Sequence, residues 1–284
     1  MSKVKPTGRP AMFTKEEDLY ILDNYMTKTS SEIGEMLGYG AKQIQARALR
    51  LGMRKKRVFD NRYFKDIDTK EKAYWLGLLY ADGWVICDKN RSNYEISIEL
   101  QRNDRYMLER LNNVFGGVFQ IKDIDKEHVF IIQSYCNTHS SVLRMYSRAM
   151  AEDLVSNGIV QNKTYKNEYP VVSDDLFIDF YRGYFDGNGC IYNYTAKGKN
   201  RVQINITTPN HEFALFCQKK LLELYGVSSS VYKENDMKNR VVVTKTNDMK
   251  RLCELMYADD NAPKLLRKYN IYISNLGPQA ERSA

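Results

Sequence analysis

The sequence YWLGLLYADGWV, residues 74–85, recurs in altered form as FYRGYFDGNGCI, residues 180–191. Each copy is an apolar segment of helical length that ends in an Asp-Gly or Asn-Gly pair. Glycine suits a left-handed exit from a helix, which we expect at Gly83 and Gly189. We therefore expect two similar helices, about one hundred residues apart, to organise the chain.

The residues that follow each copy also match. Both copies precede an alternating apolar strand, a helix, two more strands and a helical tail. The later strands are expected at 118–122 and 128–134 in the first repeat, and at 229–233 and 240–245 in the second. With one further strand directly after each motif, each repeat reads helix, two strands, helix, two strands, helix (αββαββα). We predict an α+β fold with repeats at 69–169 and 170–284, which form a pseudo-dimer within one chain.

The two motif helices carry small residues four positions apart, and residues with this spacing share one helix face. These residues are Gly77, Ala81, Gly183 and Gly187. Small side chains on one face let two helix backbones approach closely. Packing the helices side by side would bring Asp82 and Asn188, at their C-terminal ends, together.

Residues 1–57 hold a charge surplus of +6 out of the total of +8. Thr14 with Glu17 and Thr29 with Glu32 are capping boxes that predict two helix starts. The residues of the first two helices that we expect to face the core are Leu19, Ile21, Leu22, Tyr25, Ile33, Met36 and Leu37. A third helix is expected from 41 to 51. Its polar residues are expected to face solvent: Lys42, Gln43, Gln45, Arg47 and Arg50.

A run of four basic residues ends this region and precedes a linker at 58–68. The run consists of Arg54, Lys55, Lys56 and Arg57. Such a run is commonly a solvated linker, but between two nucleic-acid modules it can also follow a phosphate backbone.

Several classes of protein are disfavoured by composition. Five cysteines without a CxxC pair argue against a disulfide framework or a structural zinc site, and three histidines disfavour histidine-based catalysis. No membrane-length apolar run and no secretory signal are present. We expect a soluble, intracellular, cytoplasmic protein, and the basic charge points to a polyanion partner.

The residue patterns resemble two known families. The three helices, with a Gly-bearing turn before a basic third helix, resemble the Myb-like or helix-turn-helix domain, although a plain three-helix bundle remains an alternative. The paired motifs and their downstream order, over about residues 63–273, resemble the LAGLIDADG homing endonucleases. This second resemblance implies a DNA-binding saddle of two repeats, a monomeric pseudo-dimer, intron mobility, and site-specific cleavage of double-stranded DNA.

In that family, the acidic residue before the final glycine of each motif binds a divalent metal, here Mg²⁺ or Mn²⁺. Asp82 fits this role, but Asn188 stands where the family has an acid, and a neutral amide binds a hard cation poorly. Asn188 could be an engineered inactivating substitution, the mark of a slow or nicking enzyme, or that of a relative that only binds DNA. We expect impaired double-strand cleavage; the alternative is a non-cleaving regulator or an intron-splicing maturase.

The resemblance also implies supporting residues. Lys163 and Lys268 are candidates for a lysine near the cleaved phosphates, and Gln101, with Thr208 as a weaker counterpart, for a residue that orders the attacking water. Asp186 and Tyr80 are interpreted as helix-packing positions. Base contacts are expected from outward strand residues and their approaches: Arg91, Asn93, Asn193, Lys199, Arg201, Gln203 and Asn205.

Overall fold

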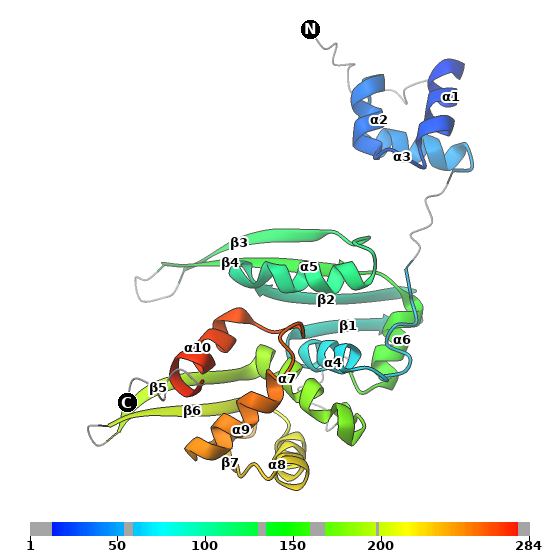
Figure 1. Cartoon of the computed structure of the whole chain (residues 1–284). Helices are drawn as coiled ribbons and strands as arrows, with labels where there is room; N and C mark the ends of the chain where they lie inside the picture. Colours follow the sequence, from blue (N-terminus) through cyan, green and yellow to red (C-terminus); the bar gives the residue numbers. More distant parts are fainter. Residues whose placement is uncertain (1–12, 54–58, 130–134, 160–167, 197–198, 278–284) are drawn as a thin grey trace. The chain divides into compact units, whose positions relative to one another are not determined.

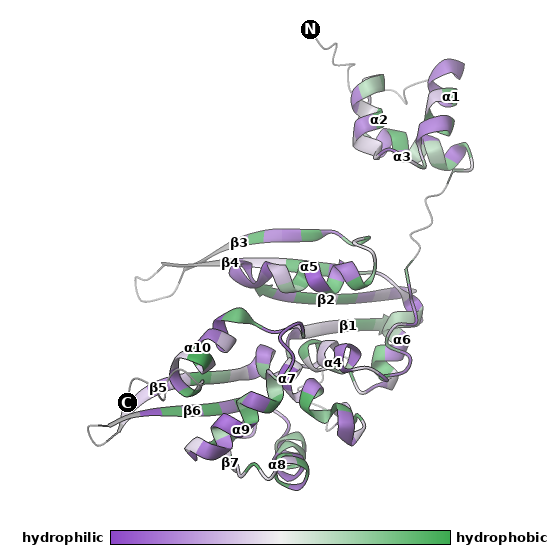
Figure 2. Ribbon diagram, viewed as in Figure 1, coloured by the Kyte–Doolittle hydropathy of each residue, from purple (hydrophilic) through white to green (hydrophobic). Residues whose placement is uncertain are grey.

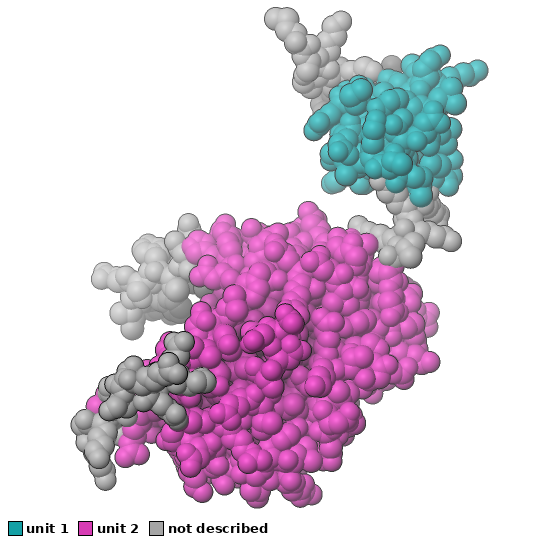
Figure 3. All heavy atoms as spheres, viewed as in Figure 1, with its two compact units in different colours: residues 1–58 teal, residues 59–284 magenta. Residues whose placement is uncertain are grey.

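The computed structural model describes residues 13–53, 59–129, 135–159, 168–196 and 199–277. The chain divides into two compact units, Met1–Val58 and Phe59–Ala284 (Figure 3). Each unit has a separate hydrophobic core. Within the described ranges, no helix combines the length and the apolar content needed to cross a membrane.

The first unit is built from three helices, as predicted: α1 (Lys15–Asn24), α2 (Ser30–Leu37) and α3 (Ala41–Arg50). Both expected capping boxes form, because Thr14 and Thr29 each accept a hydrogen bond from the backbone N–H three residues later. Gly38 ends α2 in the left-handed conformation, with φ of 76°. Local sequence signals therefore decide where α1 and α2 begin and where α2 ends.

The core of this unit is smaller than the apolar pattern suggested. Leu19 and Met36 are 59% and 70% exposed, and Leu22 is also exposed, so the prediction that they face inward was wrong. A helix in so small a unit buries only one narrow stripe, and α1 uses Ile21 and Tyr25 for it. The full core consists of Ile21, Tyr25, Ile33, Tyr39, Ile44 and Ala48.

The second unit contains the two expected αββαββα repeats (Figure 1). The first repeat comprises α4 (Lys70–Asp82), β1 (Gly83–Asp88), β2 (Asn93–Gln101), α5 (Arg105–Val114), β3 (Ile121–Val129), β4 (Tyr135–Met145) and α6 (Arg148–Ser156). The second comprises α7 (Phe177–Asn188), β5 (Gly189–Ala196), β6 (Lys199–Thr208), α8 (His211–Tyr225), β7 (Ser230–Asn235), β8 (Lys238–Val243) and α9 (Thr246–Met256), followed by α10 (Leu266–Leu276).

Each repeat forms one antiparallel four-stranded sheet. The strand orders are β1-β2-β4-β3 and β5-β6-β8-β7, so the two sheets share one topology. Along β2, Ile96 and Ile98 point to the helices, and Ile204 and Ile206 do so along β6. We call the opposite side of each sheet, which bears the alternate side chains, its open face. The α+β fold and its duplication are as predicted.

The position of the β3–β4 hairpin differs from the prediction. Strands were expected at 118–122 and 128–134, whereas β3 spans Ile121–Val129 and β4 spans Tyr135–Met145. The outer strand β3 carries a long polar stretch (Figure 2). It therefore lacks the alternation of apolar and polar residues from which a strand is predicted. Pairing with β4 holds it in the sheet, so its register is a tertiary effect.

The segment expected as a linker, 58–68, belongs to the second unit from residue 59 onward. Phe64 is fully buried, and the ring of Phe59 lies 4.9 Å from that of Phe119 and 6.1 Å from that of Phe115. Burial of these aromatic rings stabilises the packed arrangement over a solvated linker. The linker prediction was therefore wrong for these residues.

Helices α4 and α7 pack against each other along their small-residue faces. A Cβ added at Gly77 would overlap the carbonyl oxygen of Phe180, and one at Gly183 would overlap that of Tyr74. Further along, the α carbon of Gly187 faces the side chain of Ala81. The expected small residues therefore lie at the contact, where they allow backbone-to-backbone approach.

The segment that follows each repeat docks on the other repeat. After the second repeat, Lys264 and Leu266 bond to Tyr106 on α5 of the first: the Tyr106 hydroxyl donates to Lys264 O at 3.2 Å and accepts from Leu266 N at 2.6 Å. After the first repeat, the ring of Tyr169 packs at a tilt of 52° against that of Phe213 on α8 of the second, with ring centroids 5.4 Å apart. These reciprocal contacts join the repeats beyond the α4–α7 contact.

We predict that Gly183→Ala lowers the free energy of unfolding of the second unit by about 3 kcal/mol, because the new methyl group forces the backbones of α4 and α7 apart. In an unconstrained helix, the same change is stabilising by up to about 1 kcal/mol. Urea unfolding followed by circular dichroism measures the difference.

The matched control is Gly226→Ala. Gly226 has a φ of 65° and open space around it, so this variant reports left-handed strain without a clash, expected at about 1 kcal/mol. Equal losses in the two variants would contradict the close-approach explanation.

Candidate active site

The C-terminal ends of α4 and α7 meet at one place. Asp82 and Asn188 are the last residues of these helices. The expected left-handed exit was wrong: Gly83 and Gly189 have φ of -82° and -97°, because the chain passes directly into the extended strands β1 and β5. A Cβ on Gly187 would lie 3.0 Å from Asp82 Oδ2, so the Asp82 carboxylate lies against the last turn of α7. The Asp82 side chain is exposed to solvent.

Tyr184 holds the side chain of Asn188. Asn188 Nδ2 donates to the Tyr184 hydroxyl at 3.3 Å, and that hydroxyl donates to Thr207 O at 3.0 Å. Burial raises the pKa of Tyr184, and the negative charge of Asp82 acts in the same direction. Sequence reasoning missed Tyr184, although its spacing of four residues from Asn188 on one helix face was a usable signal.

Lys268 has a different position from the one expected. Its side chain is 3% exposed, and its Nζ donates three hydrogen bonds, to the carbonyl oxygens of Phe185, Asp186 and Gly189 at 2.6, 2.7 and 2.6 Å. All three ammonium hydrogens are thus used. The prediction that Lys268 approaches a phosphate was wrong; it caps the C-terminus of α7, where a cation is favourable.

The charge of Lys268 persists despite its burial. Desolvation lowers the pKa of Lys268 to about 8, and the nearby carboxylates of Asp186 and Asp82 partly oppose that shift. At neutral pH, the side chain therefore stays mainly protonated, as its three carbonyl partners require.

Asp186 anchors the segment that precedes α10. Its Oδ2 accepts hydrogen bonds from the Tyr74 hydroxyl at 2.6 Å and from Leu265 N at 2.9 Å. Burial raises the pKa of Asp186, which is fully enclosed. The pseudo-equivalent residue Tyr80 donates to Glu168 O at 3.4 Å, so both positions hold the segment that follows a repeat.

The meeting point offers one carboxylate and one amide. Among the described residues, no group of three or more His, Cys, Asp or Glu side chains is arranged to hold a metal. Mg²⁺ is often held by one or two carboxylates with the remaining positions filled by water and substrate phosphates. Asp82 fits such a site, whereas Asn188 adds only a neutral oxygen.

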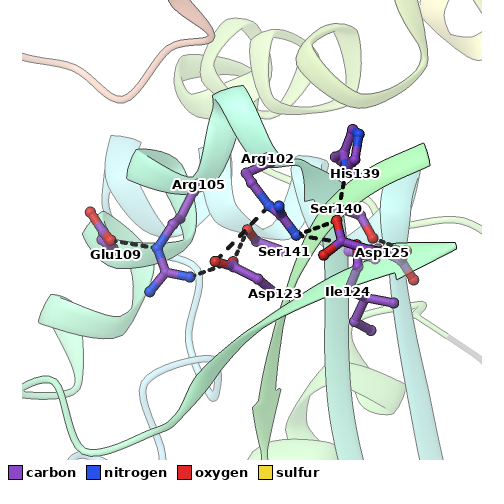
Figure 4. A network of polar contacts seen from close by, with 10 residues as sticks. Arg102, Arg105, Glu109, Asp123, Ile124, Asp125, His139, Ser140 and Ser141 are labelled. Atoms are coloured by element: carbon purple, nitrogen blue, oxygen red, sulfur yellow. Dashed lines mark hydrogen bonds and ion pairs between the residues drawn. The ribbon is translucent and has the colours of Figure 1, made fainter. Parts of the chain in front are cut away.

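A second pair of acidic side chains lies on β3, where residues of β4, of α5 and of the turn before α5 already neutralise it (Figure 4). Asp123 bonds to Arg105 at 2.6 Å and to the Ser141 hydroxyl at 2.6 Å, and Asp125 bonds to Arg102 at 2.8 Å and to His139 at 2.6 Å. These pairs fasten the outer strand to α5 and to the turn before it. We therefore assign the cluster to stability.

Apart from Asn193, the expected base-contacting residues fall into three groups. Arg91, Asn93 and Arg201 are exposed. Asn205 is 5% exposed, and the Tyr192 hydroxyl donates to Gln203 at 2.5 Å, so these two are partly committed to the sheet. The side chain of Lys199 lies outside the described residues.

Asn193 was expected to point outward but lies on the helix side of β5. It alternates in phase with the buried Ile191, and its Nδ2 donates to Asn275 Oδ1 on α10 at 2.7 Å. Asn193 is exposed, as expected, but it lies on the helix side of the sheet, where it contacts α10, and not on the open face.

The water-ordering candidates differ between repeats. Gln101 is exposed at the end of β2, and β2 continues past the pairing of Gly83 with Ile98 toward Asp82. Its weaker counterpart Thr208 is 1% exposed, and its hydroxyl accepts from Asn210 N at 3.2 Å. Lys163 lies outside the described residues.

The polar residues of α3 also differ in whether they bond to other groups of the protein. Lys42, Gln45 and Arg50 are exposed. Gln43 Oε1 accepts from Gly40 N at 2.9 Å, and Arg47 forms a two-point ion pair with Asp18, at 2.7 Å from Nε and 2.5 Å from the terminal nitrogen. Two of the five expected contacts therefore have structural partners. Arg54, Lys55, Lys56 and Arg57 lie outside the described residues.

Comparisons with known proteins find partial likenesses to solved structures. No curated protein matches the chain. The homing endonuclease I-WcaI bound to its DNA recognition sequence is 16% identical with a TM-score of 0.45, over 69% of this chain and 84% of that one. I-SmaMI bound to uncleaved DNA in the presence of calcium ions is 12% identical with a TM-score of 0.47, over 74% and 95%.

Full-length DUF199/WhiA from Thermatoga maritima is 15% identical with a TM-score of 0.41, over 76% of this chain and 66% of that one. In sequence, residues 178–257 match the family described as the LAGLIDADG-like domain. This match spans the second repeat, from within α7 to just past the end of α9.

Proposed function

We propose that this chain is a site-specific DNA endonuclease of the homing type, in which hydrolysis of one strand is favoured over the other. The observation that carries this proposal is the meeting of Asp82 and the last turn of α7 between two open-faced sheets. Sheets of this kind can lie in the major groove and present alternate side chains to base edges.

Asp82 is the residue that would hold a divalent cation, Mg²⁺ or Mn²⁺, together with phosphate oxygens of the DNA. When bound, such a cation supplies Lewis-acid activation of water and stabilisation of the leaving oxygen. Gln101 extends on β2 toward Asp82 and is suited to orienting a water molecule there.

Asn188 makes the two halves of the site unequal. Its amide carries no charge, and the end of α7 is already neutralised by Lys268. The half-site at α7 therefore attracts a cation less than the half-site at α4, where Asp82 provides a carboxylate. Cleavage of one strand is expected to be slow or absent.

DNA binding is proposed to involve both units. Residues 1–57 carry most of the positive charge, and Lys42, Gln45 and Arg50 project from α3, in the manner of a helix-turn-helix recognition helix. The second unit supplies sequence readout from its open faces and acts as a monomeric pseudo-dimer. The protein would act on DNA inside the cell.

The alternative is a non-cleaving DNA-binding regulator or an intron-splicing maturase on the same fold. Asn188 favours it, because a protein that only binds has no need for two carboxylates. Retention of an exposed Asp82 at the helix end favours cleavage, since an acid there is opposed by the helix dipole and needs a compensating role.

We predict that the unmodified chain, with Mg²⁺ and a plasmid carrying its cognate site, gives nicked product slowly or none, and that Asn188→Asp produces linear plasmid. The added carboxylate restores an anionic ligand at the end of α7. Agarose-gel assay of nicked and linear forms measures both products.

Asp82→Asn in the Asn188→Asp background is the loss-of-function control, and Asp175→Asn, at an exposed position before α7, is the matched surface control. If the Asn188→Asp chain binds the site tightly yet cuts neither strand, the endonuclease proposal fails and the regulator remains.

We also predict that Lys42→Ala combined with Arg50→Ala reduces the slope of log affinity against log salt concentration by about 2, because each removed phosphate contact lowers it by about 1. Fluorescence anisotropy over a salt series measures the slope. Lys15→Ala, an exposed cation on α1, is the control. An unchanged slope in the double variant would show that these residues of α3 make no phosphate contact.

A further inference from the structure

The chain contains two tryptophans in opposite environments. Trp75 is fully buried within α4, whereas Trp84, the second residue of β1, is 53% exposed. Tryptophan has the largest apolar side chain and is highly buried on average. A single exposed apolar residue is ordinary in itself. A role for Trp84 therefore depends on where in the fold it lies.

Trp84 points to the open face of the first sheet. Its neighbour Val85 is 3% exposed and points to the core, and side chains alternate along a strand. Trp84 pairs with Ser97 on β2, and Ser97 pairs with Arg144 on β4. These three residues form a row across the open face, in which the small Ser97 separates the indole from an exposed guanidinium.

The row lies next to the candidate active site. Trp84 follows Asp82 by two residues, so their α carbons are at most about 7 Å apart. The two sheets begin at the ends of α4 and α7, and DNA lying on both open faces would have its centre at this point. Trp84 therefore faces the central base pairs rather than the outer part of the site.

The second sheet has no aromatic ring at the corresponding place. Cys190 follows Asn188 by two residues and pairs with Asn205, which pairs with Val242. Asn205 and Val242 are 5% and 2% exposed. The centre of the surface is thus asymmetric. An exposed indole lies beside Asp82, whereas two of the three side chains in the row beside Asn188 are buried.

Proteins that bind the minor groove often insert an apolar side chain between two base pairs and unstack them, and aromatic rings stack on the faces of unpaired bases. We propose that the Trp84 indole stacks on a base at the centre of the bound site, in the half held by the first sheet, and thereby stabilises an opened base step. This inference rests on the proposed function. It assigns Trp84 as a positioning residue for the strand nearer to Asp82.

The test uses the full chain and a duplex recovered by selection from a random 30-base-pair library, in EDTA so that no strand is cut. The emission of Trp84 is obtained as the difference between the unmodified chain and Trp84→Phe, since Trp75 is common to both. We expect this emission to be quenched on binding. Trp84→Ala should weaken affinity roughly 10-fold, and Trp84→Phe, which keeps a ring, less than about threefold.

A second readout places 2-aminopurine at each central position in turn. Its fluorescence should rise on binding in one half of the centre only, and the rise should disappear with Trp84→Ala. Leu222→Ala is the matched control, because Leu222 is 55% exposed on α8, which packs on the helix side of its sheet.

The outcomes separate this inference from the proposed function. If selection recovers no duplex, the proposed function fails and the inference fails with it. If a duplex binds while Trp84 emission is unquenched, or Trp84→Ala binds as tightly as the unmodified chain, only the role of Trp84 is overturned.

Discussion

The contact between α4 and α7 sets the geometry of the second unit. Gly77 and Gly183 each lie against a carbonyl oxygen of the opposite helix, so the backbones are as close as sterics allow. Because the helices run side by side and end together, β1 and β5 start from one place and the two sheets extend from it. A larger residue at either glycine would change the separation of the helix ends, and with it the relation between Asp82 and Asn188.

The repeats are also joined by exchanged segments, which explains why two different residues occupy the pseudo-equivalent positions 80 and 186. Asp186 accepts the backbone N–H of Leu265, whereas Tyr80 donates to the carbonyl of Glu168. A carboxylate can only accept, and a phenol can donate, so each residue matches the backbone group it meets. The duplication therefore kept the role of this position while its chemistry diverged.

The sequence predicted those features that depend on neighbouring residues in the chain. It did not predict features that depend on contacts between distant segments. Thr14 and Thr29 cap the predicted helices because a capping box is complete within four residues. The small residues of α4 and α7 were recognisable because the motif occurs twice. By contrast, the register of β3 depends on β4, and Phe59 is ordered by rings more than fifty residues away. Lys268 could not be placed from sequence, since its three partners lie on α7 and at its exit.

The position of Lys268 changes the electrostatics of the proposed site. A helix end that carries an ammonium ion on its free carbonyls no longer presents the negative potential that attracts a second cation. With Asn188 neutral as well, the local negative charge is that of Asp82, and one carboxylate holds Mg²⁺ weakly unless phosphates complete its shell. Under the proposed function, cation binding and DNA binding are therefore coupled. The ligand set becomes complete only when the scissile phosphate of the strand beside Asp82 is in place.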